Sequence, residues 1–318
     1  MLDAFGRITF ARELTAPDQS RRSLARAASA GSAERLARGA YLPTSVWAGL
    51  DAREKYLHRI VAVASTRRNP PVISHISAAA VWGPPALGDW PPEVHTTIPP
   101  NAAAHSRSGV IQHKAALSGV DLVELGGLRV TSLPRTIVDL ATTESFACAI
   151  VAADRALLVD RFGPRPAMTT RDELEAAWER AVPRRAHLRA IAVLRFAETR
   201  AESPLESISR VTMRTIGVPR PSLQVPHYDT AGFIGEPDFY WPEHGLIGEA
   251  DGDAKYLDAR FRNDRSSDEV VLDEKIREDR LRALPRTVAG WRWKAAISPA
   301  LLGRQLTDAG LPTGQKWQ

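Results

Sequence analysis

The apolar positions near the N-terminus predict two short helices followed by a pair of strands. Residues 8–14 hold a small apolar stripe, and residues 21–28 place arginines opposite a face of leucine and alanine. Residues 35–42 then alternate between apolar and polar side chains, as a half-buried strand pair does. This order of helix, turn, arginine-rich helix and basic hairpin is typical of a winged helix-turn-helix.

The pattern over residues 45–200 predicts a mixed α/β region. Helices are expected over 51–64, at the end of 72–82, over 132–141 and along the charged run 170–200. Residues 110–113 and 128–131 alternate like strands, and the proline-rich stretch 84–100 is expected to be a loop.

The last third of the chain predicts a helix, a hairpin and a second helix. Ser203-Pro-Leu-Glu206 has the residues of a capping box, and the helix it opens should end at Gly217. Residues 233–241 and 246–251 then form two strands joined by a four-residue loop. The charged run 268–284 predicts an exposed helix with internal salt bridges, and phosphate contact by Arg277 and Arg280 is the less favoured interpretation.

The predicted hairpin gathers four carboxylates. If Trp241 pairs with Leu246, Asp238 lies opposite Glu249, and Glu236 lies opposite Asp251. Side chains alternate along a strand, so all four would emerge on one face, where directly opposed like charges are destabilising.

A hard divalent cation would relieve this repulsion, because Mg²⁺ takes carboxylate oxygens as ligands. Lys255 follows just beyond the second strand and could reach the same face. A metal ion and an ammonium beside carboxylates are suited to hydrolysing phosphodiesters, because both neutralise charge in the transition state. The alternative to a metal site is an ordinary acidic hairpin exposed to solvent. For Glu206, the alternative to a role in the metal site is that it only caps its helix.

Charge is distributed unevenly along the chain. The net charge is +5, yet residues 1–70 carry 12 basic and 6 acidic side chains, whereas residues 201–318 carry 16 and 18. A basic N-terminal segment favours a polyanionic partner such as DNA over a small solvated helical bundle. The candidate DNA-binding residues are Arg21, Arg22, Arg26, Arg35 and Arg38.

Several classes of protein are excluded or disfavoured. No apolar run approaches the length of a membrane span, and the N-terminus lacks the pattern of a signal peptide, which favours the cytoplasm. The single cysteine, Cys148, rules out an internal disulfide and a multi-cysteine zinc site. The spacing of His75, His95 and His113 does not match a metal motif, so these are interpreted as ordinary core or surface histidines.

The carboxylate residues resemble a known superfamily. The pattern is similar to that of the PD-(D/E)XK nucleases, most of all their very-short-patch-repair (Vsr-like) branch. It consists of Asp238 on one strand, Glu249-Ala-Asp251-Gly on the next strand, and Lys255 after it. Ser74-His-Ile-Ser-Ala-Ala and Leu133-Pro-Arg-Thr-Ile-Val-Asp-Leu, together with the basic N-terminus, resemble actinobacterial proteins that join an AbiEi-antitoxin-like winged-helix region to such a domain.

The resemblance implies an α/β protein, α+β overall, with four parts. These are a winged helix-turn-helix (1–44), a middle α/β region (45–200), a restriction-endonuclease-like domain with a mixed sheet flanked by helices (201–300), and a tail (301–318). Asp238, Glu249 and Asp251 would bind Mg²⁺ or Mn²⁺, Lys255 would supply the catalytic lysine, and Glu206 would be an outer ligand. The function expected is metal-dependent cleavage of DNA.

One departure keeps a second function open. The superfamily's Glu-x-Lys is Glu249-Ala-Asp251 here, so the lysine must come from another backbone position. The alternative is a type IV antitoxin-like transcriptional regulator with an inactive nuclease fold and a cognate toxin as partner. A metal-independent protein–protein module is a third and weaker possibility.

Overall fold

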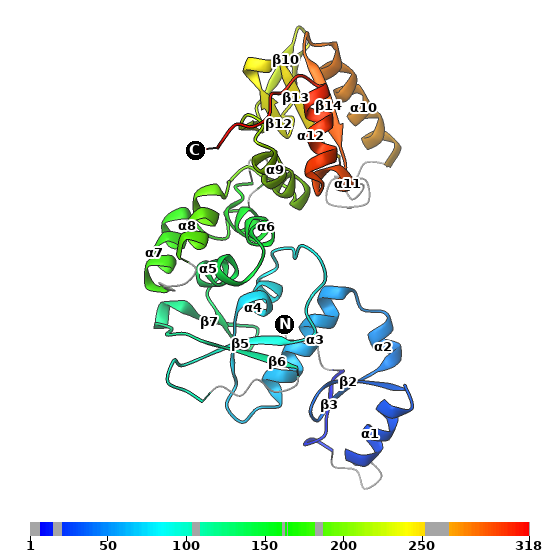
Figure 1. Ribbon diagram of the computed structural model, residues 1–318. Coiled ribbons are helices and arrows are strands. Elements are labelled where there is room, and N and C mark those ends of the chain that lie inside the picture. The colour runs from blue at the N-terminus through cyan, green and yellow to red at the C-terminus, as the bar shows by residue number, and fades with distance from the viewer. Residues whose placement is uncertain are drawn as a thin grey trace. The chain divides into compact units, whose positions relative to one another are not determined.

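The computed structural model describes residues 7–14, 21–103, 109–160, 163, 165–181, 187–251 and 267–317, with backbone alone at 267–274. The chain divides into two compact units, Met1–Ala197 and Glu198–Gln318, and both contain helices and sheets (Figure 1). The fold is therefore of the α/β class that the sequence predicts.

The first unit begins with a three-stranded antiparallel sheet in the order β1-β3-β2. Its elements are β1 (Thr9–Phe10), α1 (Arg21–Ser29), β2 (Ala33–Ala37), β3 (Ala40–Pro43) and α2 (Thr44–Ala48). The helix and the basic strand pair agree with the sequence prediction. The apolar stripe at 8–14 does not form the predicted helix at its start, because Thr9 and Phe10 pair with β3 and close the small sheet.

The rest of the first unit is a five-stranded mixed sheet, ordered β6-β5-β4-β8-β7, with helices. Its elements are α3 (Ala52–Ser65), β4 (Val72–Ile73), α4 (His75–Trp82), β5 (Val94–Ile98), β6 (Val110–Lys114), a 3₁₀ turn η2 (Gly119–Asp121), β7 (Leu122–Leu125), β8 (Leu128–Thr131), α5 (Leu133–Thr143), α6 (Phe146–Leu157), α7 (Arg171–Ala181) and α8 (His187–Phe196). Strand β5 was not predicted, because prolines surround it. The run 170–200 holds two described helices rather than one.

The small sheet and the larger sheet share one hydrophobic core. Leu36 and Leu42 of the small sheet belong to the same buried cluster as Ile60 of α3 and Ile73 of β4. The N-terminal segment is thus packed onto the middle region, and α3 contributes to both.

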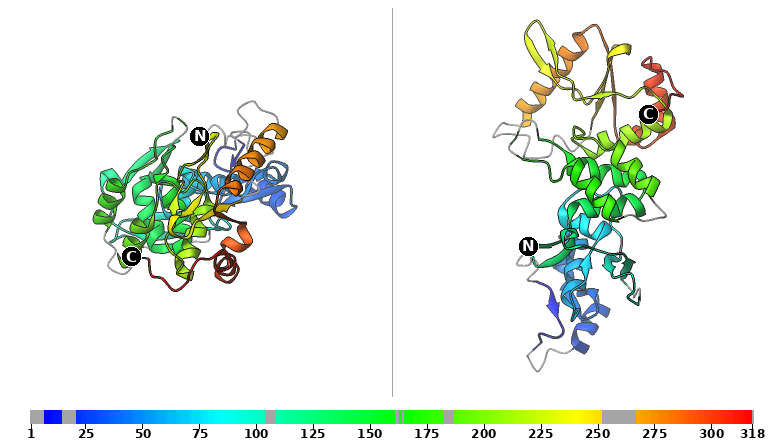
Figure 2. Two further views of the ribbon diagram at one scale, coloured as in Figure 1. Left: turned by 90° about the horizontal axis from the view of Figure 1, so that it is seen from above. Right: turned by 90° about the vertical axis from the view of Figure 1, so that its left-hand side faces the viewer.

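The second unit contains a four-stranded sheet, ordered β14-β13-β12-β9, and a separate two-stranded sheet, β10-β11. Its elements are α9 (Pro204–Ile216), β9 (Ser222–Leu223), β10 (His227–Asp229), β11 (Gly232–Gly235), β12 (Phe239–Trp241), a 3₁₀ turn η3 (Pro242–His244), β13 (Leu246–Ala250), α10 (Ser267–Ala283), β14 (Thr287–Trp291), α11 (Trp293–Ala296) and α12 (Pro299–Asp308). Within this unit, α10 and α12 lie on opposite sides of the larger sheet (Figure 2).

The predicted hairpin is present with the predicted register. Trp241 pairs with Leu246, and the ladder continues to Phe239 opposite Gly248. It stops there, one position short of Asp238, so the described ladder does not contain the predicted pairs of carboxylates. The predicted strand 233–241 is also divided, because residues 232–235 pair with β10 instead.

Residues 301–318, set apart as a tail by the sequence analysis, are part of the second unit. Helix α12 buries Leu302 and Leu306, and Leu311 follows it into the core. The chain then returns to the end of α9, where Gln315 N donates to Gly217 O at 2.7 Å.

Gly217 should be intolerant of substitution because of this return. Its φ is +78°, and an added Cβ would lie 2.7 Å from Gln315 O. We expect Gly217→Ala to lower the free energy of unfolding by about 2–3 kcal/mol, combining backbone strain with a clash. Gly310→Ala is the matched control, because its φ is +99° but the space around it is open. Urea denaturation would show equal losses for both variants if the packing of 315 against 217 were unimportant.

Candidate functional site

The predicted DNA-binding arginines all lie on the surface. Helix α1 exposes Arg21, Arg22 and Arg26, while Leu24, Ala27 and Ala28 are half-buried on its other face. Arg35 on β2 and Arg38 in the β2–β3 turn are also exposed, on either side of the buried Leu36. The structure therefore presents all five side chains to solvent from one helix and the hairpin that follows it.

The helix and the hairpin are fixed to each other by hydrogen bonds. Thr44 Oγ1 donates to Gly31 O at 2.7 Å, and Ser32 Oγ donates to Ala27 O at 3.1 Å. Gly39, with a φ of +84°, makes the turn between the two strands. These contacts hold the backbone of α1 and of the hairpin, which carry the arginines, next to each other.

In the second unit, two of the predicted carboxylates meet through a glutamine. Gln224 Nε2 lies 3.1 Å from Glu206 Oε2 and 3.2 Å from Asp238 Oδ1, so one amide group donates to both. Asp238 Oδ2 also accepts from Ala250 N at 2.7 Å. Both carboxylates and the amide are nearly fully buried.

Local sequence explains how these groups are positioned. Ser203 caps α9 by accepting from Glu206 N, and the Glu206 carboxylate turns back to accept from Glu202 N at 3.0 Å. One half of the predicted capping box, the hydrogen bond from Glu206 N to Ser203 Oγ, is therefore present, while the Glu206 carboxylate binds the backbone one residue before the cap and also contacts Gln224. Gln224 follows β9 with a φ of +50°, a conformation that is uncommon for residues other than glycine. The sequence analysis missed Gln224 because an isolated glutamine gives no motif.

The other predicted residues have different surroundings. Glu249 Oε1 lies 3.0 Å from Arg277 of α10, and Asp251 Oδ2 lies 3.7 Å from Arg292. Asp251 is the more exposed of the two, with 41% of its side chain accessible against 18% for Glu249. Lys255 lies outside the described residues. Among the residues that are described, no three His, Cys, Asp or Glu side chains are arranged to hold a metal ion.

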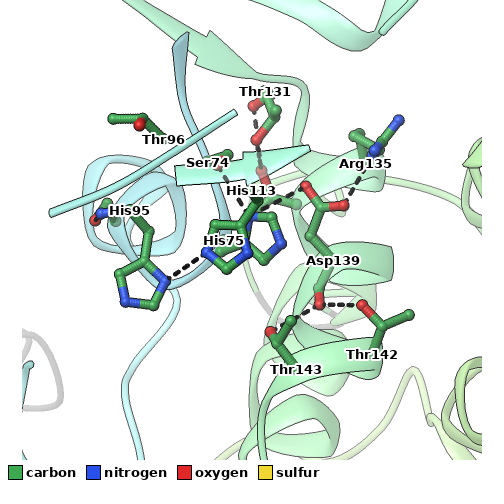
Figure 3. Close-up of polar contacts among 12 residues, drawn as sticks. Ser74, His75, His95, Thr96, His113, Thr131, Arg135, Asp139, Thr142 and Thr143 are labelled. Carbon is green, nitrogen blue, oxygen red and sulfur yellow. Dashed lines mark hydrogen bonds and ion pairs between the residues drawn. The ribbon is translucent and has the colours of Figure 1, made fainter. Parts of the chain in front are cut away.

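The first unit contains a buried polar cluster that the sequence did not reveal. His75, His95 and His113 come from α4, β5 and β6 and meet beside Asp139 of α5 (Figure 3). The rings of His75 and His113 stack with centroids 3.6 Å apart, and His113 Nε2 is 3.1 Å from His95 Nδ1.

Charged groups complete this histidine cluster. His75 Nδ1 lies 2.9 Å from Ser74 Oγ and 3.8 Å from Asp139 Oδ2. Arg135 Nε donates to Asp139 Oδ1 at 2.9 Å, and its guanidinium is also 3.8 Å from Asp121. His75 has a φ of +54°, so its place at the start of α4 is held against backbone preference.

Burial sets the charge state of the cluster. It lowers the pKa of His75 and His95, and it lowers the pKa of His113 to about 4. Burial also raises the pKa of Asp139 to about 6, against the opposing effect of Arg135. The three imidazoles are therefore neutral near pH 7, and each keeps a nitrogen lone pair.

The first unit should lose stability in acid because of these histidines. A depressed pKa in the folded state means that the unfolded chain binds protons first, so stability falls as the pH drops from about 6.5 toward 4. For His113 the loss is about 2 kcal/mol after allowance for solvent screening. The raised pKa of Asp139 has the opposite effect, because the folded chain binds this proton first as the pH falls from about 6 to 4. Protonation of Asp139 therefore offsets part of the loss of stability. Replacing His113 with phenylalanine should flatten the dependence of the urea midpoint on pH, and an unchanged slope would contradict the assignment.

Comparisons with known proteins give a limited picture. No family model matches the chain. It is 30% identical over 152 residues to the uncharacterized proteins MT2308 and Rv2248 of Mycobacterium tuberculosis, a match that covers 48% of this chain. The match spans about half the length of these curated relatives, 53% in each case.

A distant likeness to a solved structure was also found. The crystal structure of RV2827C protein from Mycobacterium tuberculosis matches with a TM-score of 0.40 and 14% identity, over 70% of this chain and 83% of that one. Separately, none of the described helices combines the length and apolar character needed to cross a membrane.

Proposed function

We propose that the protein binds DNA through the winged-helix-like segment formed by α1, β2 and β3. The observation that carries this proposal is the exposure of five arginines on one helix and its adjoining hairpin, with no fully buried residue on α1. In this proposal α1 would enter the major groove, and the hairpin arginines would reach the flanking phosphates.

The charge of the segment supports a nucleic acid over a protein partner. Only Glu34 among the described residues of α1, β2 and β3 carries a negative charge, and the five arginines surround it in sequence. Arginine is well suited to phosphate because its planar fork donates two parallel hydrogen bonds.

Fluorescence anisotropy with a labelled duplex tests the proposal directly. The 318-residue chain should bind a random-sequence duplex with a Kd of about 1–100 μM near physiological salt, the usual range for contacts made mainly to phosphates. A duplex that fails to bind at low salt would overturn it.

A second function, metal-dependent cleavage of DNA, is favoured by the buried acidic network. Glu206 and Asp238 are both buried and share the Gln224 amide, so two carboxylates lie close together where their charge must be compensated. Asp238 directly precedes β12, and it is one of the residues that the nuclease resemblance implies as metal ligands.

The donor atoms suit Mg²⁺ or Mn²⁺. They are carboxylate oxygens, which hard cations such as Mg²⁺ take as ligands. Mg²⁺ can be held by one or two carboxylates with several waters and the substrate phosphate, so a set of three protein ligands is not needed. When bound, such an ion would lower the pKa of a water molecule and neutralise developing charge. Asp238 and Glu249 would hold it, and Arg277 would restrain Glu249.

Plasmid cleavage distinguishes an active nuclease from a regulator that only binds DNA. With Mg²⁺ or Mn²⁺, we expect nicking by the wild type and by Glu243→Gln, an exposed acid in the same hairpin. Asp238→Asn and Glu249→Gln should each reduce the rate about 100-fold or more, the usual cost of removing a group that stabilises the transition state. Binding without cutting by the wild type would favour the antitoxin-like regulator instead.

A further inference from the structure

The first unit contains a small cavity beside the histidine cluster. Its volume is about 150 Å³, and its wall combines apolar side chains such as Ile76 and Leu87 with His95, Glu144 and Asp89. A cavity of about this volume can hold a molecule the size of benzene. A mostly apolar wall with a few polar groups is the usual composition of a small-molecule site.

His95 is held in a fixed orientation at this wall. The Nδ1 atom of His95 is 3.1 Å from His113 Nε2, and the His113 ring is in turn stacked on His75. The His95 ring therefore has little freedom to turn (Figure 3). Its Nδ1 is therefore engaged within the cluster, which leaves Nε2 as the nitrogen on the other side of a ring that lines the cavity. Because buried His95 is neutral near pH 7, this nitrogen can serve as a hydrogen-bond partner without bringing a positive charge.

The charged side chains at the wall are both acidic. Glu144, half-buried at the end of α5, and the exposed Asp89 line the cavity, and no arginine or lysine does so among the described residues. Arg189 of α8 acts on Glu144 electrostatically but is not part of the wall. Burial raises the pKa of Glu144, which means that its carboxylate is poorly solvated and gains from a nearby cation.

We propose that this cavity is a binding site for a small organic cation, namely a primary amine carried on an apolar body of about the size of a benzene ring. The amine would meet Glu144 and His95, and the apolar body would pack against Ile76 and Leu87. An anion is disfavoured by the two carboxylates, and a larger ligand is disfavoured by the volume. This site is independent of the DNA-binding segment and of the acidic network in the second unit.

Three probes of the same shape test the charge requirement. Benzylamine, benzyl alcohol and benzoate would each be titrated into the 318-residue chain, and binding would be followed by isothermal calorimetry and ligand-observed NMR. Benzylamine should bind saturably and about tenfold or more tightly than benzyl alcohol, because it alone forms an ion pair in a partly desolvated site. Benzoate should bind most weakly. Equal affinity for all three, or no saturable binding by any, would overturn the proposal.

Variants locate the site. Glu144→Gln keeps the shape of the side chain and should remove most of the preference for benzylamine over benzyl alcohol. Ala86→Phe, which adds bulk at the wall, should abolish binding of both, and Glu124→Gln on the exposed face of β7 should change neither. Circular dichroism and thermal midpoints would verify that each variant is folded. Unaltered discrimination in Glu144→Gln, with the fold intact, would contradict the assignment of the charge.

Discussion

Charge reversal at Arg22 and Arg26 should abolish most DNA binding. These side chains are one helical turn apart on the exposed face of α1, so both would meet the same stretch of DNA backbone. Replacing two phosphate-binding cations with two carboxylates removes favourable contacts and adds repulsion. We expect the double Arg→Glu variant to bind at least about 100-fold more weakly at physiological salt.

The control must carry the same change of charge elsewhere. Arg214→Glu combined with Arg304→Glu alters two exposed arginines of the second unit, on α9 and α12. This variant should keep affinity within a few-fold of the wild type, since only the long-range field changes. If both double variants lost affinity equally, net charge rather than the α1 surface would account for binding.

The second large effect, on stability, is expected at Arg135. This side chain is 3% exposed and lies beside two buried carboxylates, those of Asp139 and Asp121. Its guanidinium donates to Asp139 and to Ala116 O and lies close to Asp121. Arg135→Leu would leave Asp139 as a buried carboxylate without its cation. Removing one partner of a buried ion pair costs about 3–5 kcal/mol, and we expect a loss in this range by urea denaturation.

A second variant separates loss of charge balance from loss of packing. Arg135→Leu combined with Asp139→Leu removes both charges and should recover much of the stability that the single variant loses. Arg129→Leu, at the one exposed position of β8, should change the free energy of unfolding by less than about 0.5 kcal/mol. A loss below about 1 kcal/mol for Arg135→Leu would show that Asp139 is stabilised by other groups.

Local patterns predicted much of the fold. The helix from Pro204 to Ile216 could be bounded in advance because Ser203, Pro204 and Gly217 each have a specific preference at a helix end. The Trp241–Leu246 pairing followed from a four-residue loop between apolar strands. Strand β5 could not be found in the same way, because its burial depends on pairing with β4 and β6 rather than on its own alternation.

The candidate sites were harder to predict because they depend on tertiary contacts. His75, His95 and His113 are neighbours only because β5 lies between β4 and β6, and their spacing in sequence gives no sign of it. The sequence singled out the acidic residues as candidate ligands, but it did not predict the partners that each one has in the structure. Arg277 reaches Glu249 from α10, and Gln224 joins Glu206 to Asp238 from a loop. The exposure of Arg21, Arg22 and Arg26 was predicted from helix periodicity, and that of Arg35 and Arg38 from the alternating pattern of the hairpin.

The salt dependence of DNA affinity tests the central claim most directly. If the arginines at 21, 22, 26, 35 and 38 neutralise phosphates, the association constant should fall steeply with salt. A plot of its logarithm against the logarithm of the salt concentration should have a slope of about −4 to −5. The Arg22→Ala, Arg26→Ala double variant should reduce the magnitude of this slope by about 2. A slope near zero, or one that the double variant leaves unchanged, would contradict binding through this surface.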